Sequence, residues 1–411
     1  MSQAPPTGGD ARLDDRRSGP AEGDFPVVGI VGGGQLARMC QPPAVALSVT
    51  LSVLAASEAE SAALVVPDAL VGAPDDLDAV RRLAARSDVV TFDHEHVPAD
   101  VLAALAADGV RLHPTPEALR FAQDKVAMRR RLTELGFPCP RWTVARTADE
   151  VTAFGGDVGW PLIAKTPRGG YDGKGVRLVR AADEVADWLD AVGEPGPLLD
   201  GVLLEEAVSF TREVAALVAR NPSGEARAWP LVETVQADGI CTEVLAPAPD
   251  VDAAAAKGAT DMALRIAEEL GVTGVLAVEL FEVDDDEGGA TFLVNELAMR
   301  PHNSGHWTIE GSVTSQFEQH LRAVVDLPLG STDVRSRWTV MANVLGGSRQ
   351  ALYPEVRRLL ADDPELRVHL YGKEVRPGRK IGHVTVCGDD LDDLRARARR
   401  AADQLRGAHD R

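Results

Sequence analysis

The side chains of this protein that could do chemistry begin with its lysines, which are few. Lysine and arginine together number 43, and only six of these are lysine. Five of the six lie in segments with other unusual features: Lys125, Lys165, Lys174, Lys373 and Lys380. Because a compact ammonium group is a point partner for a phosphate oxygen, these five lysines are candidate anion contacts.

The strongest local signal is the segment 163–175, IAKTPRGGYDGKG, which predicts a strand ending at Lys165 and then a loop. The loop contains Gly169, Gly170, Tyr171, Asp172, Gly173, Lys174 and Gly175. Since glycine allows a close backbone approach and positive φ values, we predict a flexible lid over phosphate oxygens. The spacing is not that of a Walker A loop. A plain β-hairpin would explain the glycines but not the two lysines.

Two isolated carboxylates interrupt apolar runs in the second half of the chain. Glu279 lies in the run 276–281 and Glu296 in the run 292–297, and an acidic loop joins them. A lone buried carboxylate is costly unless it is paired or binds a cation. The runs therefore predict an antiparallel pair that shares Mg²⁺, because one or two carboxylates plus substrate phosphates usually hold this ion. Two solvated edge carboxylates are the alternative, which fits the apolar neighbours poorly.

The elements that must position these residues begin with alternating strands and helices. Apolar strands at 27–31, 49–54 and 89–92 predict a parallel α/β sheet. Two strand ends then carry carboxylates. The first is the run DHEH at 93–96, in which adjacent residues point to opposite faces, so we predict Glu95 as a pocket wall and the histidines as wall or core residues. The second, at 203–208, could bind an adenine edge and ribose hydroxyls.

The turn after the first strand is rich in glycine. The pattern Gly32-x-Gly34-x-x-Ala37, with Glu58 further on, satisfies the dinucleotide fingerprint and leaves a nicotinamide oxidoreductase as a distant alternative. The signal is weak, since any tight turn before a closely packed helix selects glycine. We favour a turn whose backbone N–H groups face some other phosphate.

Helix and turn signals divide the chain into domains. Thr115-Pro116 starts and Gly136 stops a predicted helix of about twenty residues that carries Lys125. A small α+β lobe follows, and from Glu213 strands dominate. We predict a disordered lead-in at 1–24 and three domains, at 25–135, 136–210 and 211–411.

Composition excludes several classes of protein. The net charge of −20 argues against nucleic acid or an anionic membrane as a partner. No apolar run approaches the ~18 residues needed to cross a bilayer, so we expect a soluble, cytoplasmic protein. Its four cysteines lie far apart, which argues against a zinc or redox centre.

In this order the motifs resemble the ATP-grasp superfamily over residues 27–387. Four segments resemble the N5-carboxyaminoimidazole ribonucleotide synthase family within it, and they are 33–39, 169–175, 295–308 and 376–383. The resemblance implies an N-terminal Rossmann-like sheet, a small lid domain and a larger mixed antiparallel domain. It also implies a homodimer.

The resemblance assigns residues to three groups of contacts. ATP would contact Lys125, Lys165, Gly170, Gly173, Gly175, Glu205, Glu206, Ala207, Val208, Glu213, Gln236 and Asn295. Glu279 and Glu296 would bind Mg²⁺ or Mn²⁺. The substrates would contact Gln35, Glu95, Tyr171, Asp172, Lys174, Arg300, His302, Asn303, Ser304, Lys373 and Arg379 or Lys380. The chain departs from the family at Gln236, where histidine is common, and in the order Met-Arg-Pro-His at 299–302.

The implied activity is an ATP- and bicarbonate-dependent carboxylation of 5-aminoimidazole ribonucleotide through carboxyphosphate, in purine biosynthesis. We expect the basic segment 371–380 to clamp the 5′-phosphate, although an exposed basic turn is the alternative. Asp172 is the candidate for steering or deprotonating the amine, with Tyr171 and Lys174 beside it. An ATP-grasp ligase that makes a different acyl phosphate is the close alternative.

Overall fold

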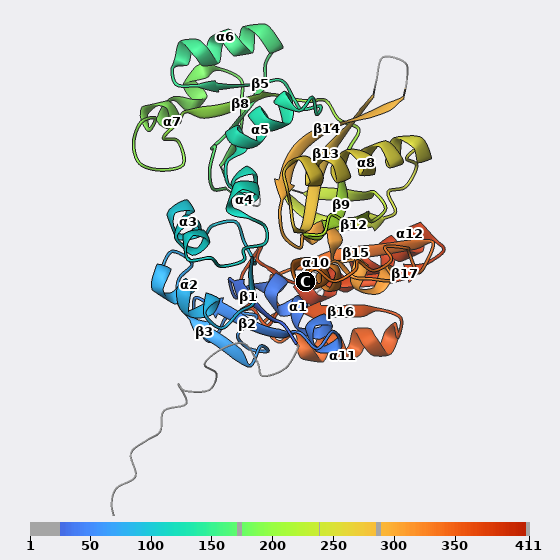
Figure 1. Ribbon diagram of the computed structural model, residues 1–411. Coiled ribbons are helices and arrows are strands. Elements are labelled where there is room, and N and C mark those ends of the chain that lie inside the picture. Colours follow the sequence, from blue (N-terminus) through green and yellow to red (C-terminus); the bar gives the residue numbers. More distant parts are fainter. Residues whose placement is uncertain (1–24, 171–174, 238, 285–288, 408–411) are drawn as a thin grey trace, which may run out of the picture.

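The computed structural model describes residues 25–170, 175–237, 239–284 and 289–407. Across these residues the strands form three sheets with helices around them (Figure 1). The predicted mixed α/β architecture, with one parallel sheet, one small antiparallel sheet and one larger antiparallel sheet, is confirmed. Tyr171, Asp172, Gly173 and Lys174 lie outside the described residues.

The first sheet is parallel, in the order β3-β2-β1-β4. Its elements are β1 (Val27–Val31), α1 (Gln35–Ala46), β2 (Thr50–Ala55), β3 (Asp68–Val71), α2 (Leu77–Ala84), β4 (Val89–Phe92) and α3 (Ala99–Ala107). Strand β1 is buried throughout, which explains its uninterrupted apolar run. Edge strand β3 was missed by sequence analysis; its four residues are half-buried or exposed.

The single helix expected between Thr115 and Gly136 is wrong, because the structure has two helices there. Helix α4 (Pro116–Gln123) ends at Asp124, and α5 (Lys125–Glu134) begins directly after it. Asp124 has an extended backbone, and its carboxylate accepts from Ala127 N at 2.9 Å as the cap of α5. The break places Lys125 on the first turn of α5, at the junction with the next domain.

The second sheet is small and antiparallel, in the order β5-β8-β6-β7. Its elements are β5 (Trp142–Ala145), α6 (Ala148–Val158), β6 (Leu162–Lys165), β7 (Val176–Val179), the 3-10 helix η2 (Ala182–Val185), α7 (Ala186–Asp190) and β8 (Val202–Glu206). Helix α6 starts at a reciprocal capping box of Thr147 and Glu150. The sheet delivers Lys165 and Glu205 from neighbouring strands.

The third sheet follows the order β14-β13-β9-β11-β12-β15-β17-β16, with β10 on β9. Its strands are β9 (Arg212–Arg220), β10 (Ala226–Ala228), β11 (Val232–Ala237), β12 (Ile240–Ala246), β13 (Gly274–Asp284), β14 (Ala290–Ala298), β15 (Trp338–Leu345), β16 (Arg367–Leu370) and β17 (Lys380–Gly388). Its helices are α8 (Ala253–Glu269), η3 (Asn303–Gly305), α9 (Thr308–Gly311), α10 (Gln316–Val324), α11 (Tyr353–Asp362) and α12 (Leu391–Arg406).

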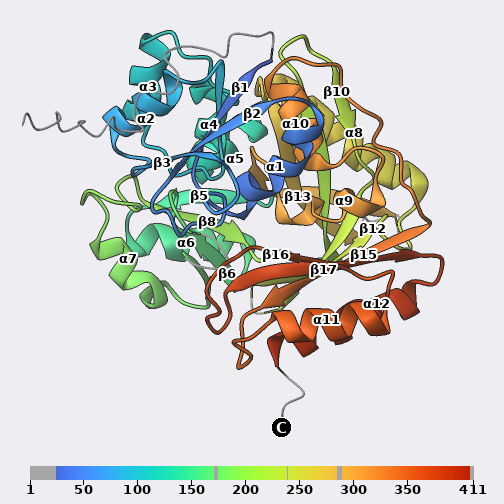
Figure 2. The same ribbon diagram turned by 90° about the horizontal axis from the view of Figure 1, so that it is seen from below.

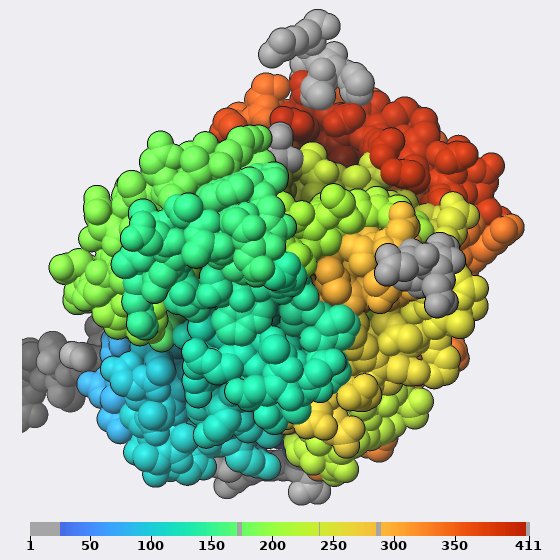
Figure 3. Space-filling view, turned by 90° about the horizontal axis from the view of Figure 1, so that it is seen from above, coloured from blue at the N-terminus to red at the C-terminus, as the bar shows by residue number. Residues whose placement is uncertain are grey.

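Helices join the sheets into one molecule. Helix α10 packs between α1 of the first domain and β13 of the third, while α11 and α12 lie together beside β15 and β17 (Figure 2). From above, the small-sheet domain lies beside α8 and the β13–β14 hairpin (Figure 3). The strands of the three sheets fall within 25–135, 136–210 and 211–411, which we keep as proposed domain limits. Among the described residues no helix is both long and apolar enough to span a membrane.

Candidate active site

A cavity of about 590 Å³ lies between the small sheet and the large sheet. Most residues proposed from the sequence as contacts line it, although they come from all three domains. These are Glu95, Lys125, Lys165, Gly170, Glu205, Glu206, Ala207, Val208, Glu213, Gln236, Glu279, Asn295, Glu296, Arg300, His302, Asn303, Ser304 and Lys380. The tertiary structure thus gathers side chains that lie far apart in the sequence, from Glu95 to Lys380.

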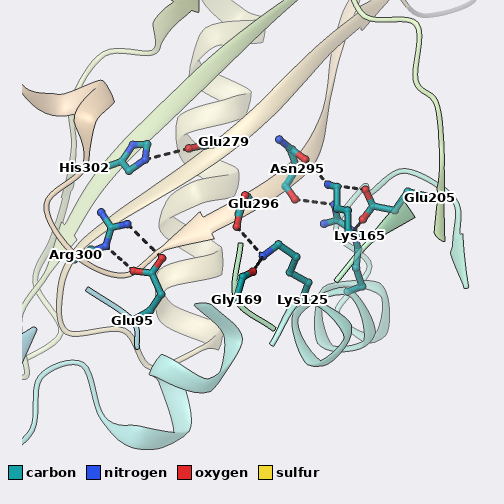
Figure 4. A network of polar contacts seen from close by, with 11 residues as sticks. Glu95, Lys125, Lys165, Gly169, Glu205, Glu279, Asn295, Glu296, Arg300 and His302 are labelled. Atoms are coloured by element: carbon teal, nitrogen blue, oxygen red, sulfur yellow. Dashed lines mark hydrogen bonds and ion pairs between the residues drawn. The ribbon is translucent and has the colours of Figure 1, made fainter. Parts of the chain in front are cut away.

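Lys165 reaches the cavity from the end of β6, with its side chain 9% exposed. Its Nζ lies 2.8 Å from Glu205 Oε2 and donates to Asn295 Oδ1 at 3.0 Å (Figure 4). Burial by itself would raise the pKa of Glu205, but Lys165 and Arg129 outweigh it and lower that pKa. The Glu205 carboxylate is therefore engaged by two cations, so we expect its effect on a nucleotide to pass through Lys165.

Lys125 connects the small sheet to the large one. Its Nζ donates to the Gly169 carbonyl at 3.2 Å and lies 3.3 Å from Glu296 Oε1 (Figure 4). Its backbone N–H also donates to Pro167 O at 2.8 Å. The glycine segment thus starts from a fixed point beside β14. Gly175 ends the segment with φ of +73°, and its carbonyl accepts from Thr166 N.

The predicted antiparallel pair that carries the two isolated carboxylates is confirmed. Glu279 on β13 is the register partner of Glu296 on β14, with a bulge directly after Glu279. His302 Nε2 lies 3.1 Å from Glu279 Oε1 (Figure 4). Burial raises the pKa of Glu279, but His302 and nearby cations outweigh it and lower that pKa below its ordinary value. Each carboxylate thus has a nitrogen partner within one cavity, Lys125 Nζ for Glu296 and His302 Nε2 for Glu279.

A third carboxylate, Glu213 on β9, lies beside this pair. Strand β9 pairs with β13, and burial together with Glu279 raises the pKa of Glu213 to about 7, with Lys165 opposing. No group of three or more His, Cys, Asp and Glu residues able to hold a metal ion occurs in the part of the chain that the structure describes. Two carboxylates plus phosphate oxygens nevertheless match the usual Mg²⁺ site of nucleotide enzymes.

The other end of the cavity is basic. Arg300 Nε donates to Glu95 Oε2 at 2.7 Å, which confirms Glu95 as a pocket-wall carboxylate (Figure 4). Burial raises the pKa of Glu95, but Arg300 outweighs it and lowers the pKa to about 2. Asn303 and Ser304 follow on η3, and Lys380 enters from the start of β17.

Some proposed substrate contacts do not line this cavity. Lys373 Nζ donates instead to Gln35 Oε1, at the junction of the first and third domains. Of the two candidates at the end of the basic segment, Lys380 lines the cavity, whereas Arg379 is exposed and donates to Glu374 O at 3.3 Å. The structure therefore favours Lys380 as the inward-pointing cation.

At the first glycine turn two backbone N–H groups are already bonded within the protein, while the predicted phosphate contact of the turn stays a prediction. Gly34 N donates to Asp93 Oδ2 at 2.5 Å and Ala37 N to Asp93 Oδ1 at 3.0 Å, so the start of α1 already holds a carboxylate. Glu58, the candidate ribose carboxylate, is exposed. The His94 and His96 rings stack on each other at 5.4 Å, and His96 lines a neighbouring cavity.

Sequence analysis missed two features of the cavity. Phe210 and Phe281 stack at 4.7 Å in its wall, and no periodic pattern relates two rings so far apart in sequence. Arg129 is fully buried on α5, where it bonds Glu205. A signal for Arg129 did exist, because it lies three residues from both Val126 and Leu132 on the buried face of the helix.

Comparison with protein families agrees with this architecture. An ATP-grasp domain model matches residues 130–317, a ribonucleotide synthetase preATP-grasp domain model matches 26–123, and a phosphoribosylaminoimidazole carboxylase C-terminal domain model matches 339–397. The N5-carboxyaminoimidazole ribonucleotide synthase of Mycobacterium tuberculosis H37Rv is 52% identical over 385 residues, which cover 92% of this chain and 88% of that protein.

Solved structures lead to the same family. The N5-carboxyaminoimidazole ribonucleotide synthetase of Thermus thermophilus is 38% identical, with a TM-score of 0.80 over 92% of this chain and 98% of that one. The Aspergillus clavatus enzyme in complex with ADP and 5-aminoimidazole ribonucleotide is 31% identical, with a TM-score of 0.81 over 93% and 98%. The chain therefore belongs to the N5-carboxyaminoimidazole ribonucleotide synthase family of ATP-grasp ligases.

Proposed function

We propose that this protein uses ATP and bicarbonate to carboxylate the exocyclic amine of 5-aminoimidazole ribonucleotide, in purine biosynthesis. The observation that carries the proposal is a single cavity with lysines and paired carboxylates at one end and a second basic cluster at the other. The first end suits a nucleotide triphosphate and the second suits an anionic co-substrate. The relatives named above bear the name of this synthase, and one of them was solved with ADP and 5-aminoimidazole ribonucleotide bound.

At the nucleotide end of the cavity, cations would contact the phosphates and an aromatic wall would contact the base. Lys125 and Lys165 would bind phosphate oxygens, since a charged hydrogen bond to phosphate contributes about 1.5–3 kcal/mol. Strand β8 ends at Glu206, which leaves the backbone groups of Ala207 and Val208 beyond its strand pairing and available to an adenine edge. Phe210 and Phe281 supply a flat apolar surface in the same wall.

Glu279 and Glu296 would hold Mg²⁺ or Mn²⁺, because oxygen ligands from facing carboxylates are what these ions select. The bound ion would neutralise charge that develops on the transferred phosphoryl group. Lys125 and His302, which contact these carboxylates, would hold them in place beforehand.

The basic end would bind and orient the anions. Arg300, whose Nε and Nη2 both donate to Glu95, lines the cavity and would contribute positive charge for bicarbonate there. Lys380, Asn303 and Ser304 would contact the ribonucleotide. Attack of bicarbonate on the γ-phosphorus would give carboxyphosphate and ADP. The amine would then capture the carboxyl carbon, as the C–O bond to phosphate breaks and inorganic phosphate and a proton are released. Tyr171, Asp172 and Lys174 remain predicted contacts, with Asp172 as the proton acceptor.

The test is ADP release with ATP, bicarbonate and 5-aminoimidazole ribonucleotide, omitting each in turn. We expect full turnover only with all three, and ¹⁸O transfer from labelled bicarbonate into the released phosphate. Turnover that is indifferent to the ribonucleotide would contradict the substrate. Transfer of ¹⁸O from another labelled acid, and none from bicarbonate, would instead assign an ATP-grasp ligase with a different acyl phosphate.

The family resemblance further implies a cytoplasmic homodimer, which we adopt as part of the proposal. Light scattering of the purified protein tests the assembly and should give twice the chain mass of 43.6 kDa. A mass equal to one chain at micromolar concentration would refute it.

A further inference from the structure

Four residues at the junction of α5, the small sheet and the large sheet form a closed ring of polar contacts. Arg129 Nε donates to Glu205 Oε1 at 2.5 Å, and Glu205 Oε2 lies 2.8 Å from Lys165 Nζ. Lys165 Nζ donates to Asn295 Oδ1 at 3.0 Å, and Arg129 Nη2 donates to the Asn295 carbonyl at 2.7 Å. Each member thus bonds two others, across elements from three parts of the chain.

The ring is buried and carries an uneven charge. The side chains of Arg129 and Glu205 are 0% and 3% exposed, and Lys165, Glu205 and Asn295 line the cavity whereas Arg129 does not. Two cations share one carboxylate, since Asn295 is neutral, so the four side chains carry one net positive charge. With Arg129 removed, Glu205 would neutralise Lys165 and the ring would carry none.

Stability alone does not account for this arrangement. A buried set of charges is often no more stable than apolar residues of similar volume, because desolvating ions is costly. The other buried residues of α5 are apolar: Val126, Ala127, Met128 and Leu132. The ring therefore needs a reason in addition to stability, and its cation Lys165 lines the cavity.

We propose that Arg129 is a positioning residue for the nucleotide-binding lysine. By occupying one oxygen of Glu205 it keeps Lys165 from being neutralised, and by holding the Asn295 carbonyl it fixes β14 against α5. Arg129 does not line the cavity described above, so it acts on a nucleotide only through Lys165 and Asn295. This inference rests on the proposed function, in which Lys165 contacts phosphate.

The experiment measures nucleotide binding by calorimetry, together with the melting temperature of each protein. Arg129→Met removes the charge but keeps an unbranched side chain, and we expect Mg-ADP to bind about 10- to 100-fold more weakly. Binding of adenosine, which has no phosphate, should change by less than about threefold. Arg130→Met is the matched control, because Arg130 is the exposed next residue of α5.

A double variant separates the charge argument from a structural role. Glu205→Gln in the Arg129→Met background restores one net positive charge to the ring, so Mg-ADP affinity should recover by about tenfold relative to Arg129→Met. A merely structural role predicts no recovery, because a second ring contact is lost. Equal or weaker ADP binding in the double variant would overturn the proposal.

If Arg129→Met does not fold, Arg129→Lys serves as the test variant instead. Lysine keeps the charge but cannot reach Glu205 and the Asn295 carbonyl together, so the melting temperature should fall while Mg-ADP affinity stays within about threefold. A tenfold loss of affinity in Arg129→Lys would overturn the charge argument. Failure of the unsubstituted protein to bind Mg-ADP would instead refute the proposed function itself.

Discussion

The turn after β1 and the cavity at β13–β14 both look like anion sites in the sequence, yet they differ in what they already hold. At the turn, the N–H groups of Gly34 and Ala37 are taken by Asp93, which comes from the end of β4. In the cavity, lysines and carboxylates meet around open space. A glycine pattern shows that a backbone can approach an anion closely, and the fold decides which anion is there.

The two regions also differ in whether their carboxylates are matched by hydrogen-bond donors. The start of α1 has one carboxylate matched to backbone donors, which suits the positive end of a helix dipole. The cavity instead places Glu213 beside Glu279, and burial with this neighbour raises the pKa of Glu213 to about 7. Unfavourable charge proximity is typical of functional sites rather than of structural turns.

The largest expected effect comes from removing the two facing carboxylates. Glu279→Gln with Glu296→Gln keeps the shapes but removes the oxygen charges that would hold the metal ion. Because metal-bound charge stabilisation contributes several kcal/mol, turnover should fall by about a thousandfold or more. Steady-state ADP release over a Mg²⁺ titration measures this loss.

The matched control is Glu268→Gln, an exposed carboxylate on α8. It should leave turnover and its Mg²⁺ dependence unchanged. If the double variant kept turnover within about tenfold at every Mg²⁺ concentration, the cavity would be no better an ion site than the glycine turn.

An intermediate effect is expected at the turn. Asp93→Ala removes two hydrogen bonds from the start of α1, so the free energy of unfolding should fall by about 1–2 kcal/mol. Mg-ADP affinity should be unchanged, because the nucleotide is proposed to bind in the cavity. Denaturant unfolding and calorimetry test the two halves of this statement. Tenfold weaker ADP binding, or protection from melting by NADH, would make the turn a candidate nucleotide site again.

The smallest effect concerns Glu213 and pH. Its raised pKa means that the folded protein keeps a proton between pH ~4.5 and ~7 that the unfolded chain has lost. The stability contributed by this group is present below pH ~4.5 and is lost as pH rises through ~7. Glu213→Gln should therefore raise the melting temperature at pH 8 relative to the unsubstituted protein, with less gain at pH 5. An equal difference at both pH values would contradict the raised pKa.

The sequence by itself determined the local elements and the chemical types at their ends. Buried runs predicted β1, β2 and β4, and the position of Lys165 at a strand end is confirmed. The two interrupted apolar runs became the antiparallel pair β13 and β14 with Glu279 opposite Glu296. These predictions succeeded because strand periodicity and the cost of burying a carboxylate are properties of short segments.

Only the tertiary structure decided which donors and charges are already matched. Asp93 lies 59 residues from the N–H of Gly34 that it binds, and Arg129 lies 76 residues from Glu205. The tertiary structure also places Lys380, and not Arg379, in the cavity wall, and it ends one helix and begins another at Asp124. Hydrogen bonds and ion pairs depend on distances of a few ångströms between residues far apart in sequence. Those distances are set by how the three sheets pack together.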